Sequence, residues 1–463
     1  MINELEKAIQ IFENHKIQIL ACSPQYMEET LYEISENNLT SLYIIGGIES
    51  KCIIFSVRDI NAVFVYSVNQ NISHNKSIMN NCLKIELITP QLGWLINADN
   101  IIFRLKNRKK VCLISLAKTE IYTFPRFALG ISYIANSLRE QNLSVVSLFD
   151  LQFMTTDDII SEIKYIVPDI IGISMTFGLF DVMEELVERL KLLFPKTKIV
   201  IGGSLATIEY SEILCRFPEL IISLGEGEET WPQLMQCLYE KSDLSVISNI
   251  AYSLETITVT NRTFPVHQFS LPVLDLLIPT IESKGVFQLE TSRGCYNACS
   301  FCPRHHKGLW KPIVDENSFR YFIQLYVDYL RIYNFEATNF VIYIVDEEFV
   351  GSDCTENRKR INTITSILLE YSIRFEISFR MTNVYTACSS QDDNFEKIEF
   401  LKQLKKNGLN RVLVGVESGV DTVLKRFNKN VTVRENIIGI RLLTALGIPV
   451  RFTYITFDPL MNL

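Results

Sequence analysis

Residues 290–308 read ETSRGCYNACSFCPRHHKG and carry the feature that decides the fold. They place Cys295, Cys299 and Cys302 in one short loop, directly after VFQLETSRG, a run that predicts a strand. Gly294 allows the backbone to turn before the first cysteine without a side-chain clash. Thiolates are the usual protein ligands of iron–sulfur clusters, and three of them leave one iron of a 4Fe–4S cube open to a small molecule. The loop therefore predicts a cluster with one open iron.

Structural zinc is the main alternative for these cysteines. The three thiolates, together with His305 or His306, would complete a Cys3His ligand set. Those ligands would be crowded into a much shorter stretch than the separated ligand pairs of common zinc sites. A chance grouping in a chain with many cysteines is the remaining alternative. The spacing favours the iron–sulfur cluster over both.

The composition limits the kind of protein that this chain can be. It has 463 residues, more than one ordinary domain holds, and its 48% of hydrophobic residues can build several cores. A formal net charge of -8 without basic stripes argues against a nucleic-acid partner. The 11 cysteines are an odd number in a chain without a signal peptide, and no apolar run reaches membrane-spanning length. We therefore predict a cytoplasmic protein with no membrane partner.

Hydrophobic periodicity divides the first half of the chain into two parts. Residues 1–107 combine helical runs at 2–15 and 26–37 with the strand-like stretches YIIGG, CIIFSV and AVFVYSV. They contain no motif, so they are predicted to be an α/β region of unknown role. Residues 108–240 alternate short apolar strands with amphipathic helices, which predicts a doubly wound parallel sheet of Rossmann type.

The second half of the chain also has two parts. Residues 241–285 are less regular and are interrupted by prolines, so we predict a linker with one small hairpin. Residues 286–463 contain five strands with helices between them, which predicts a partial (β/α) barrel. The cysteine loop follows the first of these strands, at the end where parallel barrels hold their chemistry. The predicted fold class is therefore α/β, with a Rossmann-like sheet followed by a barrel.

The spacing GCxxxCxFC after a strand resembles the signature of radical S-adenosylmethionine (SAM) enzymes. The resemblance implies that the open iron of the 4Fe–4S cluster chelates SAM through its methionine amino and carboxylate groups. An external electron donor of the flavodoxin or ferredoxin type would then reduce the cluster, and SAM would be cleaved to a 5′-deoxyadenosyl radical. That radical would abstract a hydrogen atom from the substrate, while the protein orients and shields the reaction.

Three later stretches, IVDEEFVG, ISFRMTN and VLVGVESG, end successive strands and resemble the same superfamily. The resemblance implies that acidic groups of the first stretch accept hydrogen bonds from the SAM ammonium group. It also implies that an arginine of the second pairs with the SAM carboxylate, and that the third holds the ribose hydroxyls. The SAM-binding residues so predicted are Asp346, Glu347, Arg380, Gly415, Glu417 and Ser418. Solvated acids at a barrel rim are the alternative for the first stretch.

Residues 108–240 resemble the cobalamin-binding domain that precedes many radical SAM domains. The resemblance rests on VCLISL, FPRFALGISYIANSLREQNLSVVSLFD, IGISM, VIGGS and LGEGEET. It implies that small or polar residues near strand ends admit cobalamin, namely Ser174, Thr176, Gly202 and Gly203. The sequence has no Asp-x-His-x-x-Gly motif and no histidine in this part, so this domain would give cobalt no histidine ligand. A Rossmann unit that binds nothing is the alternative.

The family resemblance predicts cobalamin-dependent methylation of an unactivated carbon in a small molecule or peptide. Radical cyclisation or rearrangement is the first alternative reaction. The last predicted strand is followed only by DPLMNL, whereas the family's barrel normally adds a sixth strand. We therefore expect an open barrel that a partner or a missing segment completes. A shortened chain that binds a cluster without turnover is the non-catalytic alternative.

Overall fold

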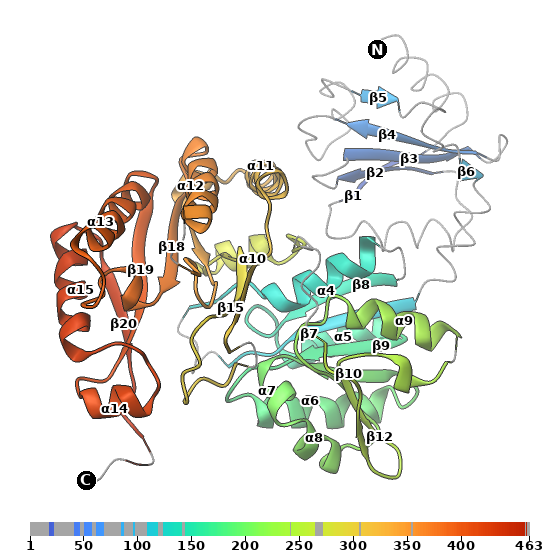
Figure 1. The fold of residues 1–463 in the computed structure, drawn as a ribbon. Helices are drawn as coiled ribbons and strands as arrows, with labels where there is room; N and C mark the ends of the chain where they lie inside the picture. Colours follow the sequence, from blue (N-terminus) through green and yellow to red (C-terminus); the bar gives the residue numbers. More distant parts are fainter. Residues whose placement is uncertain are drawn as a thin grey trace.

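The computed structural model describes most of the chain from residue 109 onward (Figure 1). In that part, the described residues are 109–118, 124–140, 144–240, 242–263, 272–304, 307–352, 355–458 and 460. Before residue 109, only the backbone of six strands is described. Among the described helices, none combines the length and the apolar character that crossing a membrane requires.

The six N-terminal strands form one sheet. They are β1 (Gln18–Cys22), β2 (Ser41–Gly46), β3 (Lys51–Val57), β4 (Ala62–Val68), β5 (Ile85–Leu87) and β6 (Ile96–Asn97). Their order is β1-β2-β3-β4-β5, with β6 also paired to β4. The three predicted strand-like stretches coincide with β2, β3 and β4. The predicted helices at 2–15 and 26–37 lie outside the described residues.

A seven-stranded sheet of order β13-β12-β11-β10-β9-β7-β8 follows, and its first five strands in the sequence are parallel. These strands are β7 (Lys109–Ser115), β8 (Ser144–Asp150), β9 (Ile170–Ser174), β10 (Lys198–Gly202) and β11 (Ile221–Ser223). The intervening helices are α4 (Leu129–Glu140), α5 (Thr156–Ile166), α6 (Phe180–Leu193), α7 (Ser204–Ile208), α8 (Tyr210–Arg216) and α9 (Thr230–Glu240). The predicted doubly wound sheet is confirmed.

Strand β7 shows why these short apolar runs form the centre of the sheet. Val111 and Leu113 are buried in one hydrophobic cluster, whereas Cys112 and Ile114 are buried in another. Successive side chains of a strand point to opposite faces, so a strand that is apolar at every position must be covered on both sides. The helices of the doubly wound fold provide that cover.

The described part of the stretch predicted as a linker extends this sheet. It holds η4 (Leu244–Val246), β12 (Ile250–Ser253), β13 (Ile257–Val259) and α10 (Leu277–Glu282). The predicted hairpin is present as β12 and β13, and β12 pairs antiparallel with β11. Pairing with the sheet satisfies backbone groups that a free linker would leave to water.

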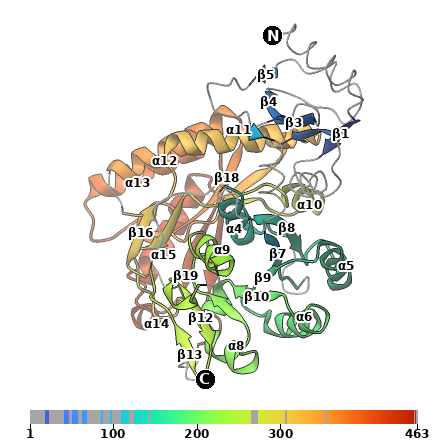
Figure 2. The same ribbon diagram turned by 90° about the vertical axis from the view of Figure 1, so that its right-hand side faces the viewer.

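The C-terminal part forms a five-stranded parallel sheet of order β14-β17-β18-β19-β20. Its strands are β14 (Gln288–Leu289), β17 (Val341–Ile344), β18 (Arg374–Phe379), β19 (Leu409–Glu417) and β20 (Val450–Tyr454). The helices are α11 (Glu316–Ile332), α12 (Thr355–Glu370), α13 (Gln391–Lys406), α14 (Asp421–Arg426) and α15 (Val433–Ala445), with the short turns η5 (Ala337–Asn339) and η6 (Met381–Asn383). Figure 2 shows α11, α12 and α13 along the outer side of these strands. The predicted β/α barrel part is confirmed.

The strand predicted over 286–294 is divided in two. Only β14 joins the parallel sheet, and β15 (Ser292–Cys295) pairs antiparallel with β16 (Leu309–Pro312). The break occurs because Thr291 and Ser292 bind the side chain of Asp346. The cysteine loop is therefore the tip of a small hairpin that projects beyond the sheet.

The two α/β units share one hydrophobic cluster. Phe127 of the first unit and Phe287 of the second have ring centroids 4.9 Å apart, and Phe287 stacks on Tyr326 at 4.8 Å. The Phe127 amide also donates to the Val286 carbonyl at 3.0 Å. Because apolar contacts of this kind resist separation, the carboxyl ends of both parallel sheets are held toward a common space.

Candidate functional site

The three predicted cluster ligands lie together in the β15–β16 hairpin. Cys299 is buried, and Cys295 and Cys302 are partly exposed. Gly294 lies within β15 and has a φ of 87°, a left-handed conformation that glycine adopts without a side-chain clash. The Cys302 amide donates to the Cys299 carbonyl at 3.2 Å, and the Gly308 amide donates to the Cys295 carbonyl at 2.9 Å. The loop is thus closed by its own backbone.

This loop has the donor set that a 4Fe–4S cluster requires. Burial raises the pKa of the Cys295 thiol to about 11, so its thiolate form needs a compensating positive charge such as iron supplies. Within the described residues, no group of three or more His, Cys, Asp or Glu side chains is arranged to hold a single metal ion. Cluster thiolates bind separate irons, so a cluster does not require such convergence. His305 and His306 of the zinc alternative lie outside the described residues.

Asp346, at the end of β17, is a buried anchor for the strand that leads to the cluster loop. Its carboxylate accepts from the Thr291 amide at 2.7 Å and from the Thr291 and Ser292 hydroxyls at 2.6 Å each. Burial raises the pKa of this carboxyl. These contacts fix the start of β15, and a contact with SAM remains a prediction for this residue.

Glu347 follows Asp346 and contacts the cysteine loop. Its Oε1 atom lies 3.3 Å from Nε of Arg304, which follows the third cysteine. The side chain is 18% exposed and lines a cavity together with Ser292. Its position beside the cysteine loop supports the predicted contact with the SAM ammonium group.

Arg380 follows β18 and is held by Glu348, which is completely buried. The backbone N and the Nε of Arg380 donate to Oε2 of Glu348 at 3.2 and 3.1 Å, and Asn383 donates to Oε1 at 2.8 Å. Burial raises the pKa of Glu348 to about 7 despite the nearby guanidinium. This arrangement sets the direction of the Arg380 side chain, whose predicted role is to pair with the SAM carboxylate.

The GVESG segment at the end of β19 contains a buried ion pair. Glu417 has a φ of 63°, and its Oε1 lies 3.1 Å from Nζ of Lys429 and accepts from the Thr453 hydroxyl at 2.9 Å. A Cβ atom at Gly415 would lie 2.4 Å from both charged ends, so only glycine leaves room for the pair. Ser418 is buried beside it and accepts from the Val420 amide at 3.2 Å. Contacts of this segment with the SAM ribose remain a prediction.

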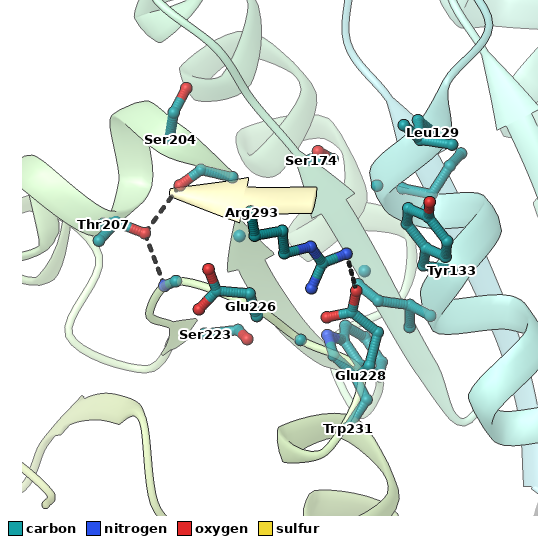
Figure 3. Close-up of a pocket in the computed structure, with 18 of the residues that line it drawn as sticks. Leu129, Tyr133, Ser174, Ser204, Thr207, Ser223, Glu226, Glu228, Trp231 and Arg293 are labelled. Atoms are coloured by element: carbon teal, nitrogen blue, oxygen red, sulfur yellow. Dashed lines mark hydrogen bonds and ion pairs between the residues drawn. The ribbon is translucent and has the colours of Figure 1, made fainter. Parts of the chain in front are cut away.

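A cavity of about 600 Å³ lies between the doubly wound sheet and the cysteine hairpin (Figure 3). Among the predicted cobalamin residues, Ser174, Gly202 and Gly203 line it, whereas Thr176 is exposed and does not. At Gly202 the cavity wall is open, since the nearest heavy atom to a Cβ placed there would be 3.7 Å away, whereas a Cβ at Gly203 would lie 2.3 Å from the Met175 carbonyl oxygen. Thr207 joins two glycine turns of this wall, donating to the Gly203 carbonyl at 3.0 Å and accepting from the Gly225 amide at 2.9 Å. Such a wide, glycine-lined cavity fits a large planar group.

A buried cluster of charges crosses the cavity and was missed from the sequence. The Arg293 guanidinium donates to Glu228 of the doubly wound unit at 2.5 Å and to Glu290 at 2.9 Å. Figure 3 shows Arg293 reaching from β15 toward Glu228. Arg293 also lies over the ring of Tyr133, 5.2 Å from its centroid. An arginine directly before the GC motif is a usable signal, because an arginine buried there requires acidic partners.

Comparison with known proteins agrees with this architecture. Residues 123–235 match the B12 binding domain, and residues 289–460 match the Radical SAM superfamily. The chain therefore has a B12-binding domain ahead of a radical SAM domain, and it resembles the cobalamin-dependent radical SAM enzymes. This confirms the predicted resemblance and its cofactors: the 4Fe–4S cluster, SAM and cobalamin.

Two relatives and one solved structure show which known proteins this chain resembles. The 4'-phospho-dehydrooxetanocin synthase of Priestia megaterium is 29% identical over 451 residues, which cover 94% of this chain and 60% of the relative. An uncharacterized methyltransferase of Pyrococcus horikoshii is 25% identical and covers 69% of this chain and 67% of its own length. The solved structure of the cobalamin-dependent SAM radical enzyme OxsB with aqua-cobalamin bound has a TM-score of 0.78 and 25% identity, covering 99% of this chain and 64% of OxsB. The chain thus spans less than two thirds of the synthase and of OxsB.

The buried charges of Arg293 make a testable contribution to stability. Replacing Arg293 by Met leaves the Glu228 and Glu290 carboxylates buried without their partner, so we expect a loss of about 3–5 kcal/mol in the free energy of unfolding. Adding Glu228→Gln to this variant should recover part of the loss. The matched control is Arg216→Met, which removes an exposed pair with Glu184 and should cost less than about 1 kcal/mol. Equal urea midpoints for the two single variants would contradict the expectation.

The raised pKa of Glu348 predicts a pH dependence. The folded chain holds this proton more tightly than the unfolded chain, whose value is near the ordinary 4.5. Glu348 therefore makes its full contribution to the free energy of unfolding below about pH 4.5, and this contribution is lost as the pH rises through about 7. We therefore expect wild type to lose stability relative to Glu348→Gln between about pH 5 and about pH 8, measured by urea denaturation. If the free energies of unfolding of the two proteins changed with pH in parallel, the pKa of the Glu348 carboxyl would not be raised in the folded chain.

Proposed function

We propose that this chain acts as a cobalamin-dependent radical SAM enzyme that cleaves SAM reductively. One observation carries the proposal: a single cavity is lined both by the glycine turns of the B12-binding domain and by residues next to the cysteine loop. Reactions between bound groups are fast only when the groups are held close together and correctly oriented. The shared cavity provides that proximity.

The proposal gives each of the chain's own residues a role. Cys295, Cys299 and Cys302 would hold the cluster, Glu347 would accept from the SAM ammonium group and Arg380 would pair with its carboxylate. When bound, the cluster, SAM and cobalamin supply the one-electron and radical chemistry. The segment with Gly415, Glu417 and Ser418 would hold the ribose, while Ser174, Gly202 and Gly203 line the cavity that would hold cobalamin.

The proposed reaction is methylation of an unactivated carbon in a small molecule or peptide. An external donor of the flavodoxin or ferredoxin type would supply electrons. The second candidate is a radical cyclisation or rearrangement, which is supported by the similarity to relatives named anaerobic magnesium-protoporphyrin IX monomethyl ester cyclase. Arg262 and Arg304 also line the cavity, and guanidinium groups suit an anionic substrate.

Reductive cleavage of SAM is the first test. The anaerobically purified chain is reconstituted with iron and sulfide, mixed with SAM and dithionite, and assayed for 5′-deoxyadenosine. We expect wild type to form it and the triple variant Cys295→Ala/Cys299→Ala/Cys302→Ala to fall to background, because no ligands remain for the cluster. The control is Cys388→Ala, which removes an exposed cysteine outside the loop. Zinc without iron in wild type, or an active triple variant, would refute the assignment.

The fate of the SAM methyl group separates the two candidate reactions. SAM with a trideuterated methyl group is incubated with the reconstituted chain, hydroxocobalamin, reductant and a panel of phosphorylated small molecules and peptides. Methylation transfers the labelled group, so the product gains its mass. Cyclisation or rearrangement yields a product without the label, and mass spectrometry distinguishes the outcomes. An unlabelled product formed together with 5′-deoxyadenosine would replace methylation by the second candidate.

A further inference from the structure

Asn297 lies between the first two cluster cysteines and contacts the sulfur atoms of both. Its backbone amide donates to Sγ of Cys295 at 3.4 Å, and its side-chain Nδ2 donates to Sγ of Cys299 at 3.1 Å. The residue is only 6% exposed, so water competes little for these bonds. One buried residue thus places donors on two of the three ligand sulfurs: its backbone amide on Cys295 and its side chain on Cys299.

The orientation of the Asn297 amide follows from its other contacts. Its Oδ1 accepts from Nδ2 of Asn430 at 2.7 Å, so its NH2 group must face the opposite way, toward Cys299. The carbonyls of Asn428 and Lys429 lie 3.3 and 3.2 Å from the same NH2 group and share its two hydrogens with the sulfur. A negatively charged thiolate is the strongest acceptor among the three.

The segment 427–430 holds the cluster loop from outside. The Asn428 side chain donates to the Ala298 carbonyl at 2.9 Å, and the Ser300 amide donates to the Phe427 carbonyl at 3.0 Å. Asn428 and Asn430 have φ values of 51° and 53°, which asparagine tolerates better than most residues. This segment therefore keeps Asn297 in place without itself touching a sulfur atom in any described contact.

We propose that Asn297 is a positioning residue that raises the reduction potential of the cluster by donating hydrogen bonds to the sulfurs of Cys295 and Cys299. The proposal rests on the proposed function, since it requires the cluster. Reduction adds negative charge that is shared with the thiolate ligands, and N–H donors stabilise that charge. The electron that cleaves SAM has to enter this cluster first, so Asn297 sets which reductants can deliver it.

The same segment links the cluster loop to the predicted ribose site. Lys429 pairs with Glu417 at 3.1 Å and lies 5.6 Å from the ring centroid of Phe301, which is inside the cysteine loop. The backbone carbonyl of Lys429 accepts from the Asn297 side chain, so Lys429 contacts both Glu417 and Asn297. The position of Asn297 is thereby tied to the GVESG segment expected to hold SAM.

The test compares cluster potentials in the reconstituted full chain, with no SAM or substrate present. Asn297→Leu keeps the approximate shape of the side chain but removes its donor. Asn297→Asp keeps the acceptor for Asn430 and also removes the donor. Asn428→Ala is the matched control, because it loosens the loop at Ala298 without removing a bond to sulfur. Iron content and a redox titration followed by electron paramagnetic resonance are measured for all four proteins.

We expect both Asn297 variants to bind four irons and to show a more negative midpoint potential, while Asn428→Ala stays at the wild-type value. A wild-type potential in an iron-loaded Asn297→Leu protein overturns the proposal. Folded Asn297 variants that take up no iron also overturn it, because the residue would then serve assembly and not potential. Wild type that binds no iron would instead refute the proposed function, so the two failures are distinguishable.

Discussion

The ion pairs of Arg293 are the constraint on which the site depends. Arg293 directly precedes Gly294 and Cys295 in β15. Its guanidinium lies between Glu228 of the B12-binding domain and Glu290 of the radical SAM domain. A buried charge is tolerated only when its partners stay in place, so the pairs keep the cysteine hairpin against the cavity wall. The shared aromatic cluster around Phe287 holds the same two domains together from the apolar side. Apolar packing and the ion pairs of Arg293 together therefore fix the distance between the cysteine hairpin and the cavity wall of the B12-binding domain.

The cluster loop is supported from both of its sides by distant parts of the chain. Asp346 binds the residues before the loop, and the segment 427–430 binds the loop itself. Asp346 follows β17, and the segment 427–430 follows α14. Asp346 is buried, so movement of the residues before the loop would leave a donor or acceptor unsatisfied. Asn428 is exposed and adds a hydrogen bond to the loop backbone at Ala298. A rigid loop suits a metal centre, whose ligands must keep their positions as its charge changes.

Local patterns predicted much of this structure. The apolar strands, the amphipathic helices, the hairpin at β12–β13 and the cysteine loop all depend on neighbouring residues, so they could be read directly. The split of the strand over 286–294 could not, because it depends on Asp346 binding Thr291 and Ser292. The sequence also did not predict that β12 joins the doubly wound sheet, because this depends on its pairing with β11.

The sequence by itself predicted the cluster ligands and the resemblance to radical SAM enzymes, because the spacing of three cysteines in a short loop is a local property. Only the tertiary structure decided which polar groups surround that loop. Arg293 and Glu228 are 65 positions apart, and Asn297 and Asn430 are 133 apart. Hydrogen bonds act over about 3 Å, so such pairs form only when packing has already brought their segments together. The same reason explains why Ser174, Gly202 and Gly203 line the cavity while Thr176, two residues after Ser174, does not.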